Sequence, residues 1–424
     1  MAKATVLIDA NNFYASCEKM IDPSLMGRPL VILSNNDGCI ISRSSEAREL
    51  NISMGVPYFK VRHKLKQLGV HVRSSNYSLY GDISRRLMAI LSVHCEELET
   101  YSIDEAFVQL TRPQEYTLYS WARQLRTLIY KNLGIPIAIG IGTNKVHAKI
   151  ANHLAKTVAT HAGIFDLDIE KDKDNWLKSV PIEDVWGVGR QLTHWCKLQG
   201  IKNAKQLRDM PSNKLKAKVG IVGIRLQNEL RGESCIKLIS SPPQRKEMCV
   251  SKSFKQVITN KKELQQAIAC HIVQAGKKLR KQKQRARKIS VFTRTSSYTA
   301  TFYSQVATET LNTSSNDTNV LLKAALALTE QIYRPHIPLR KAGVLMQGLQ
   351  SMDYQQQNLL ESKDIEKQLK NERLMETIDK LNNLYGDKAM TWCVCGTRKG
   401  WDMRREKLSP ASTTVYEEIP IVKI

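Results

Sequence analysis

Residues 100–110, with the sequence TYSIDEAFVQL, predict a strand, a turn and a second strand, with Asp104 and Glu105 at the turn. Residues 5–8, TVLI, predict a buried strand that ends at Asp9. Isoleucine then alternates at positions 135, 137, 139 and 141, which indicates a further strand. Because helix-like segments separate these strands, residues 1–165 predict a domain that combines a sheet with helices.

Three carboxylates, those of Asp9, Asp104 and Glu105, stand at the ends of these predicted strands. Adjacent acids in a regular strand face opposite sides, but in a tight turn both can point the same way. Such a cluster needs cations, and two divalent ions about 3.5–4 Å apart could clamp the oxygens of an in-line phosphoryl displacement. Hard oxygen ligands favour Mg²⁺. The alternative is that each acid is an ordinary turn or helix-capping residue.

The composition favours a folded protein that binds polyanions. The chain has 424 residues, 42% of them apolar, and its 64 Lys and Arg against 40 Asp and Glu leave a net charge of +24. No apolar run approaches the roughly 18 residues of a membrane helix, and no signal peptide precedes the first strand. The nine cysteines are scattered, so we expect a cytoplasmic protein of a reducing compartment, with no membrane contact.

Basic residues gather in two places of the sequence. A predicted helix after Asn144 carries Lys145, Lys149 and Lys156 on one face. A lysine in the first turn opposes the helix dipole, so Lys145 needs an anion, for which phosphate is the natural candidate; the alternative is a solvated charged face. Residues 245–294 carry 15 Lys or Arg and two acids, including a basic amphipathic helix with Lys277, Lys278, Arg280 and Lys281.

A glycine turn and a proline pair mark the middle of the chain. Residues 185–190, VWGVGR, are similar to the hairpin of a helix-hairpin-helix element, in which Gly187 and Gly189 would let backbone N–H groups approach a phosphate beside Arg190. The alternative is a plain glycine turn between packed helices. Pro242 and Pro243 favour an extended linker and therefore a domain boundary.

Several motifs together are typical of one enzyme family. Residues 9–15 (DANNFYA), 101–107 (YSIDEAF) and 144–151 (NKVHAKIA) resemble the palm motifs of the Y-family, translesion DNA polymerases. Residues 33–39 (LSNNDGC), 74–77 (SSNY) and 408–410 (LSP) resemble the UmuC-type members of that family. The resemblance extends over nearly the whole chain and is strongest in residues 4–235.

The resemblance implies an α+β multidomain fold shaped as a right-hand polymerase. The expected parts are a ferredoxin-like palm (1–30 and 76–165), small fingers (31–75), a helical helix-hairpin-helix thumb (166–236), a linker (237–246), an α/β little finger (247–350) and a C-terminal partner-binding tail (351–424). The small fingers imply an open pocket that admits damaged template bases.

The resemblance also assigns roles to single residues. Asp9, Asp104 and Glu105, with the backbone carbonyl of Ala10, would bind two Mg²⁺ ions, and Tyr14 would be the steric gate that favours deoxynucleotides. The expected contacts to the dNTP come from Phe13, Tyr14, Ser45, Arg48 and Lys156; Ser45 stands where many members have Tyr. The expected contacts to primer-template DNA come from Lys145, Lys149, Gly187, Gly189, Arg190, Lys277, Lys278, Arg280 and Lys281.

The expected function is error-prone DNA synthesis across lesions in an SOS-type response, in a bacterial nucleoid. The expected partners are a processed UmuD-type dimer, a RecA filament and a sliding clamp, the last through a degenerate motif at residues 356–360. Two alternatives stay open: a catalytically silent DNA-binding scaffold, which retention of all three acids disfavours, and a two-metal nuclease or cyclase, which would lack the Tyr14 gate.

Overall fold

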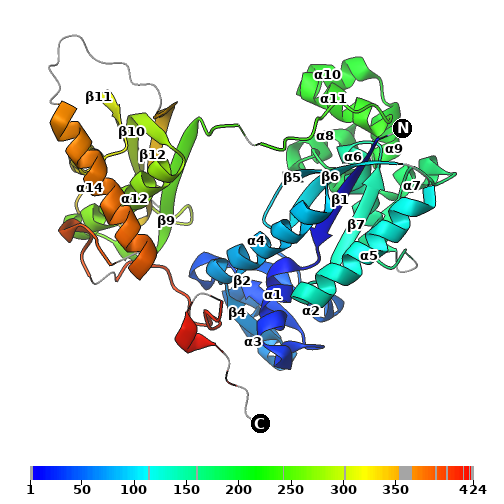
Figure 1. The fold of residues 1–424 in the computed structure, drawn as a ribbon, viewed down its shortest axis with the longest axis horizontal. Coiled ribbons are helices and arrows are strands. Elements are labelled where there is room, and N and C mark those ends of the chain that lie inside the picture. Colours follow the sequence, from blue (N-terminus) through cyan, green and yellow to red (C-terminus); the bar gives the residue numbers. More distant parts are fainter. Residues whose placement is uncertain are drawn as a thin grey trace. The chain divides into compact units, whose positions relative to one another are not determined.

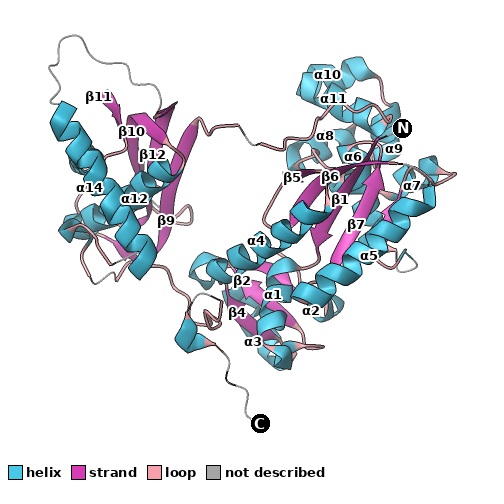
Figure 2. Cartoon of the chain, viewed as in Figure 1, coloured by secondary structure: helices cyan, strands magenta, loops and turns pink. Residues whose placement is uncertain are grey.

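The protein folds into two compact units, seen in a computed structural model (Figure 1). One unit is Met1–Pro242 with Glu406–Ile424, and the other is Pro243–Arg405. Both combine helices with a sheet, which confirms the predicted α+β multidomain class (Figure 2). The structure describes residues 3–112, 115–158, 161–241, 243–299, 302–352, 365–386, 389–397, 400–413, 415–419 and 421.

The palm of the first unit is a five-stranded sheet with the order β5-β6-β1-β7-β8. Its strands are β1 (Lys3–Ala10), β5 (Glu97–Thr100), β6 (Glu105–Thr111), β7 (Ile137–Gly142) and β8 (Ile164–Asp166). β1 pairs antiparallel with β6 on one side and with β7 on the other, so the strand that ends at the first acid is central. The strand, turn and strand predicted for residues 100–110 are thus confirmed as β5 and β6.

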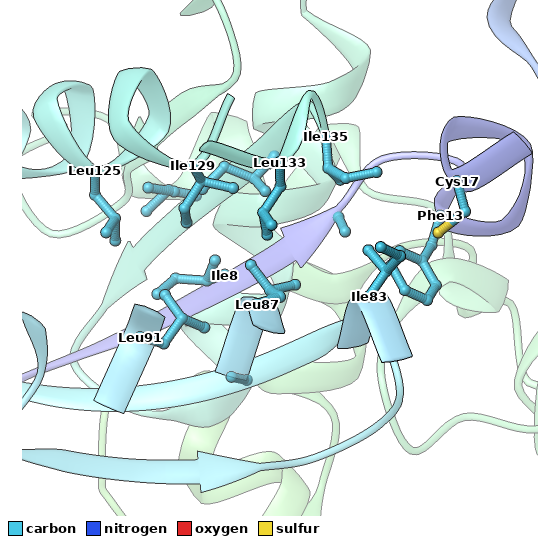
Figure 3. Close-up of a cluster of buried hydrophobic side chains, with 14 of the residues drawn as sticks. Ile8, Phe13, Cys17, Ile83, Leu87, Leu91, Leu125, Ile129, Leu133 and Ile135 are labelled. Carbon is cyan, nitrogen blue, oxygen red and sulfur yellow. The ribbon is translucent and has the colours of Figure 1, made fainter. Parts of the chain in front are cut away.

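Helices cover both faces of the palm sheet. They are α1 (Phe13–Ile21), α4 (Tyr77–His94), α5 (Glu115–Leu133) and α6 (Lys145–Thr157). On one face, Ile8 of β1 packs in the same cluster as Leu87 of α4 and Ile129 of α5 (Figure 3). On the other face α6 lies directly on β7. The two elements are so close that a side chain at Gly140 would overlap the backbone of Asn152. Burial on both faces explains why β7 is apolar throughout.

The fingers are a three-stranded sheet, β3-β2-β4, with their own small core. The elements are β2 (Leu30–Leu33), β3 (Ile40–Arg43), β4 (His71–Ser74), α2 (Ser45–Glu49) and α3 (Tyr58–Gln67). β2 pairs antiparallel with β3 and parallel with β4, which leaves β4 at an edge of this sheet. Short 3-10 helices at Pro23–Leu25 and Asn35–Asp37 flank β2.

The thumb is helical and shares its core with the inner side of α6. Its helices are α7 (Lys173–Ser179), α8 (Arg190–Leu198), α9 (Ala204–Asp209), α10 (Ser212–Val219) and α11 (Ile221–Leu230), with a 3-10 turn at Ile182–Asp184. Asn144, the N-cap of α6, donates from its side chain to the Glu229 carbonyl at 2.8 Å. This buried hydrogen bond joins the thumb to the palm within the unit.

The second unit is an antiparallel sheet with the order β11-β10-β12-β9. Its elements are β9 (Glu247–Ile258), α12 (Lys261–Lys281), β10 (Gln284–Arg294), β11 (Ser304–Ser315), α13 (Thr318–Ile332), β12 (Leu339–Ser351) and α14 (Ile365–Tyr385). Helices α12 and α13 share a core with Ile289 and Val291 of β10 and therefore cover one face of the sheet. Lys288 and Ser290, which alternate with them, face the other way.

Residues 351–424, expected as one C-terminal tail, are divided between the two units. Asp379 of α14 and Trp401 both pack on the second unit, where Trp401 is buried edge-on against Phe254 with ring centroids 5.8 Å apart. The chain then returns to the first unit at Glu406. This polar C-terminal segment therefore packs on its own protein through buried residues near both of its ends. Local sequence patterns do not reveal such packing. In the described stretches, no helix has the length and apolar character needed to cross a membrane.

Candidate active site

The β1–β6 pair places two carboxylates directly opposite each other. Asp9 and Glu105 are register partners at the ends of these strands, and the Ala10 N–H donates to the Asp104 carbonyl at 2.9 Å. Residues directly opposite in an antiparallel pair point to the same face. Burial, opposed by the attraction of Lys156 and aided by the contact with Glu105, raises the pKa of Asp9 to about 7. Two acids are therefore held together where one negative charge disfavours another.

Asp104 lies in the turn before β6 and is oriented by Ser102. The Ser102 hydroxyl donates to Asp104 Oδ1 at 2.6 Å and accepts the Glu105 N–H at 3.1 Å. Within the described stretches no three His, Cys, Asp or Glu side chains converge as a metal-binding group. The structure therefore brings Asp9 and Glu105 together but leaves the expected three-carboxylate cluster incomplete, because Asp104 is engaged by its own turn.

Two lysines of α6 neutralise the carboxylate pair. Lys156 Nζ lies 2.6 Å from Asp9 Oδ1, and Lys149 Nζ lies 2.8 and 2.7 Å from the two oxygens of Glu105. Lys149, expected on the DNA surface, thus belongs to the carboxylate site, where its ammonium also lies 4.8 Å from the centre of the Tyr101 ring. These ion pairs show that the site attracts cations.

The donor chemistry at this point fits a hard divalent cation. Two carboxylates and the adjoining backbone are oxygen donors of the kind that Mg²⁺ prefers. Asp9 is only 8% exposed, and this burial raises its pKa more than the repulsion of Glu105 does. A cation between Asp9 and Glu105 would relieve that repulsion, and the mobile ends of Lys149 and Lys156 can withdraw from the oxygens they now hold.

Tyr14 lies on a platform of aromatic rings next to these acids. Its ring stacks on Tyr80 with centroids 4.4 Å apart and planes 14° apart, and it meets the edge of Tyr77 at 6.1 Å. Burial raises the pKa of Tyr14, with Tyr77 and then Asp104 adding to the effect, so this residue, expected as the gate, lies within the field of Asp104. Phe13, expected to contact the nucleotide, is 3% exposed in the palm core. That prediction is corrected: the first residue of α1 turns inward.

Ser45 and Arg48, expected to contact the dNTP, lie on α2 in the fingers, where both are exposed. The Ser44 hydroxyl accepts the Ala47 N–H at 3.4 Å and so begins this helix. Glu46 on the same helix accepts from Lys19 of α1, which ties α2 to the palm. The exposure of Ser45 and Arg48 agrees with a binding role that stays a prediction.

Lys145 has a different role from the one we expected. Its side chain is 4% exposed, its Nζ lies 2.6 Å from Glu99 Oε2, and it lies 5.1 Å from the centre of the Phe107 ring. The anion required by a lysine in the first turn of α6 is therefore a carboxylate of β5 and not a DNA phosphate. A prediction from the helix alone was wrong because the partner comes from a strand 46 residues earlier.

The glycine hairpin of the thumb has the geometry that a phosphate contact requires. Gly187 has a φ of +91°, which favours glycine, and Gly189 is the N-cap of α8 with no side-chain cap. A side chain at Gly189 would meet nothing within 4 Å, so the start of this helix is open. Arg190 is exposed beside it. Trp186 anchors the hairpin by donating to the Tyr101 hydroxyl at 3.0 Å.

The basic side chains of α12 differ in their surroundings: some face solvent, and one is bound to a carboxylate. Lys278 and Lys281 are exposed and Lys277 is half-buried, as a DNA-facing surface would allow. Arg280 is 9% exposed and forms two hydrogen bonds to Asp379 of α14, at 2.6 and 3.0 Å. The expected DNA contact of Arg280 is therefore corrected to a structural one, since its guanidinium is already bound on both edges.

A second basic surface, which the sequence did not predict, lies on the face of the sheet opposite α12 and α13. Arg294 of β10 and Lys341 of β12 are direct partners on this face, and Lys288 is paired with Gln347. Like charges directly opposite each other destabilise a sheet unless an anion lies nearby. The signal was present as the alternation of Lys288 and Arg294 with buried residues between them, but a count of charge over the segment does not separate the two faces.

Family models and curated relatives match most of the chain. The model of the impB/mucB/samB family matches residues 8–153, that of its C-terminal domain matches residues 245–359, and a domain of unknown function matches residues 372–422. The chain is 37% identical to Protein UmuC of Salmonella typhimurium over 421 residues, which are 98% of this chain and 99% of the relative. It is 35% identical to Protein MucB of Escherichia coli over 421 residues, 99% of each.

Solved structures show the same fold. A chimera of the Y-family polymerases Dbh and Dpo4 superimposes with a TM-score of 0.64, at 19% identity, over 82% of this chain and 99% of that one. An insertion ternary complex of Dbh DNA polymerase covers the same shares with a TM-score of 0.54. With the family models and the full-length relatives, these matches show that the chain belongs to the impB/mucB/samB family and is a UmuC-type Y-family DNA polymerase.

Proposed function

We propose that this polymerase adds deoxynucleotides to a primer 3′-hydroxyl in a Mg²⁺-dependent reaction, and that it does so across template lesions. The observation that carries the proposal is the Asp9–Glu105 pair, a buried and a half-buried acid opposite each other at the ends of β1 and β6. The α6 lysines and the Tyr14 platform border the same point. Two Mg²⁺ ions, when bound, would supply Lewis-acid stabilisation of the attacking and leaving oxygens.

The chain's own residues bind and orient the reactants. Asp9, Glu105 and the Ala10 carbonyl would hold the ions, and Asp104 would join them when its hydrogen bond to Ser102 opens. Lys156, released from Asp9, would offset charge on the leaving pyrophosphate together with Arg48. The Tyr14 ring would lie under the sugar, where a 2′-hydroxyl would strike it, so that deoxynucleotides are favoured.

The proposed DNA-binding surfaces are the thumb hairpin and the second unit. Backbone N–H groups at Gly187 and Gly189 and the side chain of Arg190 suit a phosphate, and such contacts do not read sequence. In the second unit, Lys277, Lys278 and Lys281 of α12 and the Arg294–Lys341 face are two candidate surfaces. Each phosphate contact that is lost should flatten the salt dependence of binding by about 0.9 in log–log slope.

Replacing the cations of each candidate surface in turn shows which of the two surfaces binds DNA. The first variant replaces Lys278 and Lys281 by Gln, and the second replaces Arg294 and Lys341 by Gln. We expect the second to flatten the salt slope more, because its cations repel each other in the free protein. An unchanged slope in both variants would remove the second unit from the DNA-binding surface.

The partners and the cellular setting belong to the same proposal. We propose that the enzyme acts in an SOS-type response with a processed UmuD-type dimer, a RecA filament and a sliding clamp. The support is the full-length likeness to Protein UmuC. The motif at residues 356–360, through which the clamp would bind, lies outside the described residues.

Primer extension on undamaged and abasic templates tests the proposed reaction. The purified full chain is assayed with Mg²⁺ or EDTA, alone and with a UmuD-type dimer and RecA filament. We expect Asp9→Asn and Glu105→Gln to lower extension by about a thousandfold. Glu97→Gln, an exposed acid on the neighbouring strand β5, is the matched control and should extend normally. Extension that survives both site substitutions would contradict the assignment of Asp9 and Glu105 as catalytic acids. Synthesis absent under every condition would favour a silent DNA-binding scaffold.

A further inference from the structure

The returning C-terminal segment meets the fingers at residues that the sequence analysis quoted without a role. Residues 406–410, here called the C-terminal latch, run beside Ser74 at the end of β4. The Ser74 N–H donates to the Lys407 carbonyl at 2.9 Å, and the Ser74 hydroxyl accepts the Lys407 N–H at 3.0 Å. Asp37 accepts from the Ser74 hydroxyl at 2.6 Å and from the Glu406 N–H at 3.1 Å. The motifs at 33–39, 74–77 and 408–410 therefore form one contact.

The latch continues from the fingers into the palm through Ser409. This residue is 4% exposed, and its hydroxyl donates to Glu18 Oε1 of α1 at 3.1 Å. Asn76 donates from its side chain to the same hydroxyl at 3.0 Å, while its other side-chain atom caps α4 by accepting the Leu79 N–H at 3.3 Å. One serine of the C-terminal segment is thus bound to two palm elements, at the N-cap of α4 and in the middle of α1.

A short chain of contacts connects Ser409 with the proposed gate. Glu18, which is fully buried, accepts from the Tyr80 hydroxyl at 2.7 Å on the same oxygen that Ser409 contacts. Tyr80 is also fully buried, and its ring is the surface on which Tyr14 stacks, at 4.4 Å. Glu18 follows Tyr14 by one helical turn on α1, so Glu18 and Tyr14, which both contact Tyr80, are held rigidly by the same helix.

We propose that the C-terminal latch positions the Tyr14 gate, with Ser409 as the positioning residue that acts through Glu18 and Tyr80. The inference rests on the proposed function, because it presupposes that Tyr14 discriminates against the 2′-hydroxyl. Without Ser409 the Glu18 carboxyl loses a donor and can turn, and its bond to Tyr80 then no longer fixes the ring plane under Tyr14. Sugar selection then depends on a segment about 400 residues away along the chain.

The alternative is that the latch only stabilises the fold. A structural role would lower stability and total activity without changing the preference for one sugar over another. The preference itself is therefore the readout, measured as the ratio of kcat/KM for a dNTP to that for the matching rNTP. Any loss of folded protein cancels in this ratio.

The experiment compares substitutions along the contact chain in the full-length enzyme. We expect Ser409→Ala to lower the dNTP/rNTP ratio by about three- to tenfold, the range in which contacts remote from a ligand change its coupling. Ser409→Thr keeps the hydroxyl and should retain most of the ratio. Tyr80→Phe breaks the chain at another link while keeping the stacked ring, and should act in the same direction even if Ser409→Ala folds poorly. Ser412→Ala is the matched control, because the buried Ser412 hydroxyl has no hydrogen-bond partner among the residues that the structure describes.

The double variant decides whether these effects pass through the gate. In a Tyr14→Ala background the ratio should already be low, and Ser409→Ala should lower it no further. If Tyr14→Ala relaxes sugar selection while Ser409→Ala and Tyr80→Phe leave the ratio as in Ser412→Ala, the inference is overturned and the proposed function stands. If Tyr14→Ala leaves the ratio unchanged, the gate itself is wrong and the inference falls with it.

Discussion

Replacing Lys145 by Met should destabilise the first unit without changing its intrinsic affinity for DNA. The Lys145 ammonium is bound to Glu99, and both side chains are at most 10% exposed. Glu99 Oε2 also accepts the Ile239 N–H at 2.6 Å. Loss of the lysine leaves a carboxylate buried with a single backbone donor, and breaking a buried pair in this way costs about 3–5 kcal/mol.

A control variant separates the loss of this buried ion pair from the general effect of removing one positive charge. Lys173→Met is the matched control, because Lys173 is 41% exposed and its Nζ lies 3.7 Å from Asp168, which keeps Arg112 as a partner; an ion pair with a solvent-exposed lysine of this kind contributes about 0–1 kcal/mol. The double variant Lys145→Met with Glu99→Leu should recover only part of the loss. Its Ile239 N–H then has no acceptor, which costs about 1–3 kcal/mol.

Hydrogen exchange of the β6 amides measures this loss of stability within the first unit. A global unfolding transition would mix the contributions of the two units. The free energy of opening should fall by about 3–5 kcal/mol in Lys145→Met and by less than about 1 kcal/mol in Lys173→Met. Primer-template binding is then measured where both variants are folded. An unchanged free energy of opening together with a flatter salt slope would refute the reasoning and restore Lys145 to the DNA surface.

Three further outcomes follow from packing and charge. Gly140→Ala should unfold the palm, because its methyl group would overlap the backbone of Asn152, and circular dichroism of the purified variant checks this. Arg280→Ala should lower the stability of the second unit by about 2 kcal/mol in denaturant unfolding, since Asp379 loses a bidentate partner; normal stability with weakened DNA binding would contradict it. Burial raises the pKa of Glu18 above its ordinary 4.5, so the folded state holds a proton that the unfolded state releases. Stability should therefore fall as the pH rises from about 4.5 through the raised pKa, and Glu18→Gln should flatten this dependence in unfolding measured against pH.

The sequence was most informative where a property depends on neighbours along the chain. Alternation and turn residues predicted β1, the β5–β6 turn and β7, and these placed Asp9 and Glu105 at strand ends. The basic amphipathic pattern predicted a helix that carries Lys277, Lys278, Arg280 and Lys281, and α12 confirms it. Local periodicity and turn chemistry act over a few residues, so they can be seen in the order of the amino acids.

Charges were misjudged where the partner comes from a distant part of the chain. Lys145 and Arg280 stood in patterns typical of phosphate contacts, yet Glu99 and Asp379 are 46 and 99 residues away from them in sequence. A lysine or arginine looks the same in a sequence whether it faces solvent or a buried carboxylate. Only the packing of strands and helices decides which anion it meets.

The order of residues by itself determined a first domain that combines a sheet with helices, the basic character of the second unit and the acids at the strand ends, because burial patterns and strand ends are local. Tertiary structure alone decided that lysines neutralise those acids, and that Arg294 and Lys341 share one face of a sheet. It alone also brought Ser409 to Glu18. Hydrogen bonds and ion pairs require atoms to meet within a few ångströms, and a chain that folds back on itself sets those meetings independently of distance in sequence.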